Sequence, residues 1–392
     1  MITNKRILTI QDISCVGQCS LTVAQPILSA CGIETCILPS AVLSTHTGGF
    51  QDVWFRDLTE DIPKIRERWE KEGILFDAVL TGYLGSPAQI SMVKDIMNSC
   101  LLPGGLRIVD PAMADHGKLY RGFDETYVRA MAGLCGCADI LLPNLTEACF
   151  LTGTEYMEGE LEESYVRDLL EKLSAFGAGC VILKGISFEE RKLGNAVFDA
   201  AKGEVRFCFT DKVVRSSHGT GDCFAAAFTG ALLQGSSAFN AAVLASDFIV
   251  ESLLQTADDP DHWYGVKFEK ALPLLVRRLN HPEPLSRKAR EAARERLTYR
   301  LDGSSFRDAA GFYRKIAELM TDGTTETGNN LDALNDILRG GFGKHRYGEP
   351  IELVWENFQD SRETLGDPLT LRILNVILNA DDDHDCLLRI LD

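Results

Sequence analysis

The chain has 392 residues, of which 45% are hydrophobic and 25% charged, a composition typical of globular proteins rather than disordered or fibrous ones. At about 100–200 residues per domain, this length suggests two domains, or three. The 57 acidic residues outnumber the 40 basic ones, so the net charge is −17. Because such a chain lacks the basic surface that grips phosphate backbones, we expect no direct binding of nucleic acid.

The amino-terminal segment leads directly into the apolar run Ile7–Ile10, which is too short for the apolar core of a secretion signal. No stretch approaches 18 uninterrupted apolar residues, so we expect no membrane span. The twelve cysteines are scattered through apolar segments of a large chain, and we interpret them as reduced, small hydrophobic residues. Together these features predict a cytoplasmic protein.

Over residues 1–280, short apolar runs of strand length alternate with longer segments of helical periodicity. The predicted strands are Arg6–Ile10, Thr35–Pro39, Ala78–Thr81, Arg107–Val109, Ile140–Pro143 and Cys180–Lys184. The predicted helices are Ser20–Ala30, Ile62–Glu72, Pro87–Ser99, Asp124–Leu134, Glu163–Phe176 and Asp222–Gln234. This alternation predicts an α/β fold with a mostly parallel sheet covered by helices on both faces. Such sheets bind ligands at the carboxyl ends of their strands, so polar side chains there are candidates for chemistry.

Four polar side chains stand at such strand ends. Asp110 and Lys184 offer a carboxylate and a cation, and Asn144 and Glu147 follow Pro143 where a helix opens. Oxygens three residues apart suit a hydrated Mg²⁺ ion that bridges nucleotide phosphates. The same spacing is that of a capping box, in which Asn144 caps the helix and Glu147 returns the hydrogen bond. Both interpretations remain open from the sequence.

The segment His218–Asp222, with sequence HGTGD, precedes a long apolar helical run. Gly219 and Gly221 allow the amides around Thr220 to converge at the positive end of a helix dipole, which is a natural anion site. A carboxylate beside an anion site is explained if Asp222 takes the proton of a hydroxyl that attacks a bound phosphoryl group. The alternative is that Asp222 merely caps the helix.

The alternating pattern ends near residue 281, where His281–Pro284 cannot continue a helix. Residues 286–296 carry five basic residues and two glutamates with almost nothing to bury. We interpret 281–296 as an exposed charged linker, with a basic nucleic-acid patch as the alternative. The sequence therefore predicts a first domain over 1–280 and a second over 297–392.

The second unit is distinctly acidic: residues 297–392 hold 18 acidic and 10 basic side chains, against 39 and 30 in the much longer stretch 1–296. Its pattern predicts strands at 297–301, 350–355 and 386–391, helices at 305–320, 330–338 and 368–379, and a loop at 321–329. Asp332 and Asp336 are four residues apart and so share one helix face. They could be a binding face or a merely solvated one.

Residues 1–280 resemble a vitamin B6 kinase, that is, a pyridoxal/pyridoxamine kinase of the ribokinase-like superfamily. The motifs that carry the resemblance are Ile10–Ser14, Ser44–Gly48, Thr81–Gly85, Val109–Met113, Pro143–Glu147 and Gly219–Asp222. The resemblance implies ATP-dependent phosphorylation of a 5′-hydroxymethyl group, with Mg²⁺ and, alongside it, a monovalent cation. It also implies a homodimer.

The resemblance implies a role for each candidate position. Asp222 is the general base, and the amides of Gly219, Thr220 and Gly221 hold the transferring phosphoryl group. Asp110, Asn144, Glu147 and Lys184 act around Mg-ATP, and Asp12, Thr47 and Tyr83 line the substrate pocket. Asp12 stands where many pyridoxal kinases have serine, which would favour an amine such as pyridoxamine, or an aminopyrimidine. The nearest alternative is therefore a hydroxymethylpyrimidine kinase of thiamine synthesis.

The second unit resembles barstar, the intracellular inhibitor of barnase-type ribonucleases, through Leu301–Gly303, Gly328–Asp336 and Ile351–Trp355. The resemblance implies a small α/β domain in which Asp332 and Asp336 enter the basic cleft of a nuclease or bind another basic protein. The aromatic anchors of the family are replaced here by Glu326 and Asn335. A contrasting hypothesis is an interaction protein that neutralises a nuclease and carries a degenerate kinase unit. The intact glycine loop and Asp222 favour the enzyme.

Overall fold

The computed structural model describes residues 5–213, 217–257, 259, 261–280, 297–323, 328–346, 349–378, 384 and 386–391. Its contacts divide the chain into two compact units, residues 1–283 and 284–392. The predicted charged linker, 281–296, lies outside the described residues, as does Glu326. No helix among the described residues is long and apolar enough to cross a membrane.

The first unit is built on one large sheet, which confirms the predicted α/β fold. Its strand order is β11-β10-β9-β8-β5-β4-β1-β2-β3. The central strands all pair in parallel: β1 (Arg6–Ser14), β2 (Glu34–Leu43), β4 (Phe76–Thr81), β5 (Leu101–Val109), β8 (Ile140–Leu141) and β9 (Cys180–Ile186). The strands at both edges are antiparallel to their neighbours: β3 (Phe55–Asp57), β10 (Lys192–Asp199) and β11 (Glu204–Asp211).

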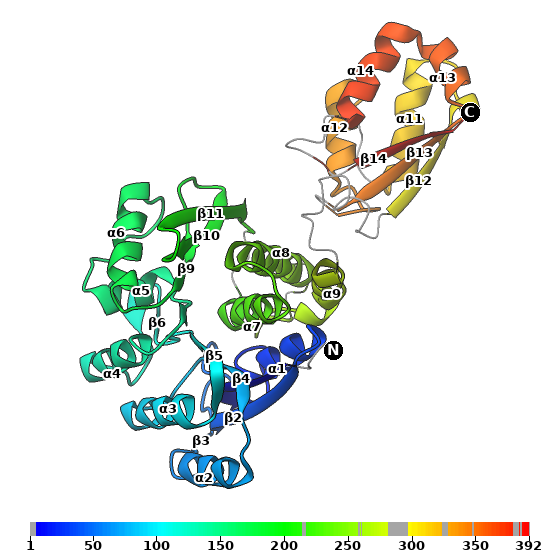
Figure 1. Ribbon diagram of the computed structural model, residues 1–392. Coiled ribbons are helices and arrows are strands. Elements are labelled where there is room, and N and C mark those ends of the chain that lie inside the picture. The colour runs from blue at the N-terminus through cyan, green and yellow to red at the C-terminus, as the bar shows by residue number, and fades with distance from the viewer. Residues whose placement is uncertain are drawn as a thin grey trace. The chain divides into compact units, whose positions relative to one another are not determined.

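Helices cover both faces of this sheet (Figure 1). Alternate strand residues point to opposite faces, so Ile7 and Leu80 enter one core while Leu8 and Val79 enter the other. One core is covered by α1 (Leu21–Ala30), α7 (Thr220–Leu233), α8 (Ala238–Ala257), the turn η1 (Phe268–Ala271) and α9 (Leu272–Asn280). The other is covered by α2 (Ile62–Glu72), α3 (Pro87–Ser99), α4 (Glu125–Cys135), α5 (Leu145–Thr152) and α6 (Glu163–Ser174).

Three sheet strands and a hairpin were not predicted from the sequence. The strand β3 has only three residues, all exposed, which is too short for an alternating apolar pattern to show in the sequence. The hairpin of β6 (Ala114–Asp115) and β7 (Lys118–Leu119) is equally short. Lys184 was also expected to end its strand, but β9 continues to Ile186 because that residue pairs with Gly194 of β10.

The second unit has a three-stranded parallel sheet in the order β12-β13-β14, formed by Leu297–Asp302, Ile351–Glu356 and Cys386–Leu391. It is packed with the short turn η2 (Gly303–Ser305) and the helices α11 (Ala309–Met320), α12 (Leu331–Arg339), α13 (Phe358–Leu365) and α14 (Asp367–Leu378). The buried Trp355 stacks on Phe312 at the centre of its core. The prediction missed α13, and placed the start of α11 too early because Asp308 caps that helix at Gly311.

Candidate active site

The candidate residues of the first unit come from neighbouring strands. Asp12 lies near the carboxyl end of β1, Tyr83 follows β4, Asp110 follows β5, Asn144 follows β8 and Lys184 lies in β9. These five strands are adjacent in the order β9-β8-β5-β4-β1 and run parallel. Their carboxyl ends therefore meet at one edge of the sheet, as the sequence argument required.

A buried ion pair lies at the centre of this edge. The Nζ atom of Lys184 donates to Oδ2 of Asp110 at 2.6 Å, and both side chains are almost inaccessible. Burial alone would disfavour the charged ammonium, but the carboxylates of Asp110 and Glu147 outweigh it and raise the pKa of Lys184. The lysine is thus held as a cation next to the place where anionic phosphates would bind.

Asn144 and Glu147 form the capping box that their spacing allowed. Asn144 Oδ1 accepts from the Glu147 amide, and Glu147 Oε2 accepts from the Asn144 amide, both at 2.8 Å. The other oxygen of Glu147 accepts from the amide of Met113 at 3.1 Å. Burial, reinforced by the charge of Asp110, raises the pKa of Glu147 to about 8. In this arrangement Glu147 ties α5 to the segment after Asp110, and its cation-binding role stays a prediction.

Asp222 lies in the first turn of α7, directly after the glycine loop. Gly219, at φ +83°, is the N-cap, and a Cβ atom there would overlap the carbonyl oxygen of Gln18. The backbone amide of Ser20 donates to Asp222 Oδ2 at 2.8 Å. Burial raises the pKa of Asp222 to about 7, and the nearby carboxylates of Asp110 and Asp12 act in the same direction. A carboxylate of this basicity can accept a proton near neutral pH.

Asp12 and Tyr83 lie on the same side of the site. Asp12 is buried, which raises the pKa of its carboxyl group, and it accepts from the hydroxyl of Ser14 at 3.0 Å. The ring of Tyr83 stacks on Phe123 at a centroid distance of 5.6 Å. Burial, together with the charge of Asp12, raises the pKa of Tyr83 to about 12. Asp12 thus lies within electrostatic reach of both Tyr83 and Asp222, as a shared pocket requires.

In the segment after Asp110, Tyr120 lies close to the carboxylates of the site, whereas His116 is exposed. Tyr120 was not predicted. Burial of its phenol raises the pKa of that group well above the usual value, and the nearby charges of Glu147 and Asp222 act in the same direction. The signal that could have found it is its place just beyond the Asp110 strand end. His116, in contrast, is exposed and lies 3.6 Å from the carboxylate of its neighbour Asp115.

Thr47 is exposed in the loop of residues 44–50, and no described contact joins it to the carboxylates. Its neighbour His46 is buried, and the His46 ring lies 5.0 Å from that of His218 at the start of the glycine loop. The loop that carries Thr47 is thereby held beside the anion site. Thr47 was predicted from the sequence and His46 was not, because nothing in the local sequence shows that this histidine is buried.

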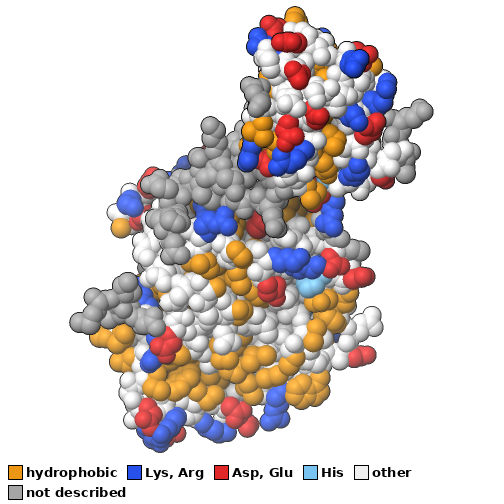
Figure 2. Space-filling view, turned by 90° about the vertical axis from the view of Figure 1, so that its right-hand side faces the viewer, with side chains coloured by type: hydrophobic (Ala, Val, Ile, Leu, Met, Phe, Trp, Pro, Cys, Tyr) orange, Lys and Arg blue, Asp and Glu red, His pale blue; other side chains and the backbone are white. Residues whose placement is uncertain are grey.

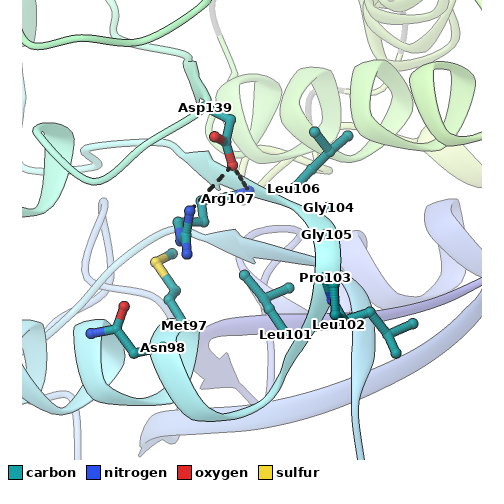
Figure 3. Close-up of a pocket in the computed structure, with 10 residues that line it drawn as sticks. All are labelled: Met97, Asn98, Leu101, Leu102, Pro103, Gly104, Gly105, Leu106, Arg107 and Asp139. Carbon is teal, nitrogen blue, oxygen red and sulfur yellow. Dashed lines mark hydrogen bonds and ion pairs between the residues drawn. The ribbon is translucent and has the colours of Figure 1, made fainter.

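A hollow in the first unit lies away from these residues. Figure 3 shows it between the end of α3 and the beginning of β5, where Asp139 contacts Arg107. It is lined by Met97, Asn98, Leu101–Arg107 and Asp139. Since Asp110 follows the other end of β5, this hollow and the carboxylate cluster lie at opposite edges of the sheet. None of the candidate residues lines it.

In the second unit, Asp332 and Asp336 are both exposed on α12, while Leu334, Ile337 and Leu338 of the same helix are buried. Asn330 caps this helix through the amide of Ala333. Arg339 approaches Asp336 at 3.3 Å. The acidic face expected from the sequence is therefore presented to solvent.

A parallel sheet that gathers a glycine-rich helix start, several carboxylates and a buried lysine at one edge defines a kinase of the ribokinase-like class. The family model described as phosphomethylpyrimidine kinase matches residues 28–265, and the chain belongs to this family. The model described as barstar (barnase inhibitor) matches residues 296–386.

Relatives of the first unit are named as kinases of B6 vitamers. A pyridoxine/pyridoxal/pyridoxamine kinase of Bordetella avium is 28% identical over 271 residues, covering 64% of this chain and 85% of its own. A Bacteroides thetaiotaomicron structure described as a phosphomethylpyrimidine kinase, in a crystal form with pyridoxal, is 35% identical with a TM-score of 0.66 and covers 70% and 96%. A pyridoxal kinase of Lactobacillus plantarum is 31% identical with a TM-score of 0.65 and covers 72% and 99%.

Proposed function

We propose that the first unit transfers the γ-phosphoryl group of ATP to the 5′-hydroxymethyl group of pyridoxal, pyridoxamine or pyridoxine. The observation that carries this proposal is the position of Asp222, at the start of α7 and within electrostatic reach of the Lys184–Asp110 pair. The relatives named for B6 vitamers support the substrate class. They favour it over hydroxymethylpyrimidine, the alternative from the sequence.

In this proposal Asp222 takes the proton of the substrate hydroxyl while the oxygen attacks the γ-phosphorus. The proton moves to an Asp222 carboxylate oxygen, the bond from phosphorus to the bridging oxygen of ATP breaks, and ADP leaves. The amides of Gly219, Thr220 and Gly221, at the positive end of α7, stabilise the charge that develops on the phosphoryl oxygens. Lys184 adds a positive charge, and its ion pair with Asp110 holds the ammonium group in place.

The residues around the ion pair fit a cation that accompanies ATP. Asp110 and Glu147 are buried, and burial, reinforced by the charge of Asp110, raises the pKa of Glu147 to about 8, so a cation bound beside it would favour its ionised form. Mg²⁺ would supply the neutralisation of phosphate charge there when bound. Asp110, Asn144 and Glu147 would hold it, directly or through water, and a monovalent cation would add to the same effect.

Asp12 and Tyr83 would contact the vitamer, with Thr47 closing the pocket from the loop of residues 44–50. The aromatic wall of Tyr83 and Phe123 suits a flat pyridine ring. The buried carboxyl group of Asp12 would accept a hydrogen bond from a protonated ring nitrogen or an amine. We therefore expect pyridoxamine to be used at least as well as pyridoxal.

The test is turnover of the full chain with Mg-ATP and, separately, pyridoxal, pyridoxamine, pyridoxine and hydroxymethylpyrimidine. Production of ADP and of the vitamer phosphate is the expected result. Turnover confined to hydroxymethylpyrimidine would assign the enzyme to thiamine synthesis. If no substrate is turned over while the second unit binds a nuclease, the interaction hypothesis with a degenerate kinase is favoured.

We further propose that the second unit binds a basic protein, such as a barnase-like ribonuclease, through Asp332 and Asp336. The match to the barstar family and the exposure of both carboxylates support this. Clustered negative charge also speeds encounter with a basic partner. The measurement is binding of the full chain to an inactive barnase-like ribonuclease at low and physiological salt, with Asp332→Ala/Asp336→Ala as the matched variant. Equal binding by that variant would contradict the proposed face.

We also propose that the kinase domain covers residues 1–280 and that the protein works in the cytoplasm.

We propose in addition that the kinase domain forms a homodimer. Figure 2 shows hydrophobic side chains gathered on one face of the first unit, which suits a contact between copies. The exposed large side chains of this unit include Val16, Trp54, Phe55 and Trp263. Light scattering after size-exclusion chromatography gives the mass directly, and a monomer at working concentration would contradict the dimer.

A further inference from the structure

His46 is a buried imidazole whose two nitrogens are both engaged. The Nε2 atom lies 2.8 Å from the carbonyl oxygen of Tyr264, and the Nδ1 atom accepts from the amide of Gly48 at 2.9 Å. A carbonyl can only accept and an amide can only donate, so these partners define the tautomer. His46 is neutral, with its proton on Nε2 and a bare Nδ1.

The same carbonyl connects this histidine to the glycine loop. The amide of Gln18 also donates to the Tyr264 oxygen, at 3.4 Å. The Gln18 carbonyl in turn fills the space that a side chain at Gly219 would need. Gly17 also packs so closely against the ring that a Cβ atom there would overlap His46. Three segments far apart in sequence thus interlock around one imidazole.

We propose that His46 is a positioning residue for the kinase reaction, which in its neutral form fixes the Thr47–Gly48 turn of the substrate pocket against the Gly219–Asp222 loop. This inference rests on the proposed function. It assigns His46 no contact with the reacting atoms. Its effect is to set where the vitamer lies relative to the phosphoryl group, and it should therefore change the KM of the vitamer more than kcat.

Protonation would break this arrangement on one side only. A proton on Nδ1 would face the Gly48 N–H with a second donor, while the bond to Tyr264 would survive. The titratable side chain that faces the ring is His218, whose charge acts on His46, while Phe50 and Gly17 are uncharged. Burial lowers the pKa of His46, so the neutral form predominates at neutral pH and the loop loosens only in acid.

Two substitutions separate the two hydrogen bonds. In His46→Asn, the amide oxygen can take the place of Nδ1 and accept from Gly48, while the reach to Tyr264 is lost. In His46→Gln, the longer side chain can donate to the Tyr264 carbonyl, while the acceptor for Gly48 is lost. His46→Ala removes both bonds. His46→Asn and His46→Gln both carry a side-chain amide, so each serves as a matched control for the other.

Steady-state kinetics with pyridoxal would be measured for the full chain and the three variants between pH 5 and 8. We expect KM to rise about tenfold or more in His46→Gln and His46→Ala, with a smaller rise in His46→Asn and kcat within about threefold. Wild-type KM should rise in acid, and His46→Asn should lose that acid limb. The inference would be overturned if kcat fell as much as KM rose, and by the same factor in all three variants. An unchanged acid limb in His46→Asn would also overturn it.

Hydrogen exchange of the Gly48 amide gives a readout that does not need activity. Protection should persist in His46→Asn and fall in His46→Gln. If the wild-type chain turns over no vitamer, the proposed function fails on its own, and exchange still decides the loop coupling. Equal protection of Gly48 in all variants would show that the histidine does not hold the loop.

Discussion

The two units use charge in opposite ways. In the first unit, the ion pair of Lys184 and Asp110 is almost fully buried, and Glu147 is satisfied by backbone amides. In the second unit, Asp332 and Asp336 lie exposed on α12, and the contact of Asp336 with Arg339 is at the surface. Buried charges fix a geometry and carry perturbed pKa values, whereas exposed charges can attract a partner without shaping the fold.

The largest effect should come from Asp222→Asn, which removes the proposed base and keeps its shape. We expect kcat to fall by about 10²–10⁴-fold, the usual contribution of one general base. Nucleotide binding, measured by calorimetry, should be retained because the amides of the glycine loop are unchanged. A variant with near-normal turnover would refute the assignment of the base.

The second-largest effect should come from breaking the buried ion pair of Lys184 and Asp110. Lys184→Met leaves the carboxylate of Asp110 buried without its cation and should destabilise the first unit by about 3–5 kcal/mol. Urea denaturation, followed by a spectroscopic signal of the first unit, measures this change in the free energy of unfolding. Lys184→Met/Asp110→Asn should recover part of the loss, since it removes the uncompensated charge. The matched surface control is Lys202→Met, which removes an exposed lysine from its pair with the half-buried Asp199. A comparable loss there would contradict the contrast between buried and exposed pairs.

The pH dependence of the kinase reaction should follow Asp222. Because burial raises its pKa to about 7, the base is protonated below that pH, and kcat/KM should fall about tenfold for each further unit of acid. Above pH 7 the carboxylate form predominates and the rate should level off. A profile that stays flat down to pH 5 would show that this carboxyl group does not act in the rate-limiting step.

The smallest effect on stability should come from the second unit. Asp336→Asn removes an exposed contact with Arg339, and such pairs contribute about 0–1 kcal/mol. The urea midpoint of that unit should therefore scarcely move, while binding to a basic partner should weaken and lose part of its salt dependence. A large loss of stability would mean that α12 depends on this charge, and the contrast between the units would then be less sharp.

Much of this arrangement follows from the sequence because strand ends are local signals. The apolar runs before Asp110 and Lys184 placed both residues at one edge of a parallel sheet, and the glycines around Thr220 indicated a helix start. The antiparallel strands β10 and β11 were missed, and so was α13, because their mixed polar and apolar residues do not stand out from loops. His46 could not be found, since its environment is built by segments far away in the chain, and Tyr120 was missed although it lies in the segment that follows Asp110.

The carbonyl of Tyr264 has a consequence for the order in which the molecule can be made. It accepts from the His46 ring, 218 residues earlier in the chain, so this side-chain anchor of the pocket loop can form only after almost the whole first unit has been synthesised, whereas the backbone bond of His46 to Val16 can form much earlier. A nascent chain that stopped at Gln255 would already carry Asp12, Asp110, Lys184 and Asp222. Such a fragment would contain the charged residues of the proposed reaction, but it would still lack the carbonyl oxygen that holds the His46 ring.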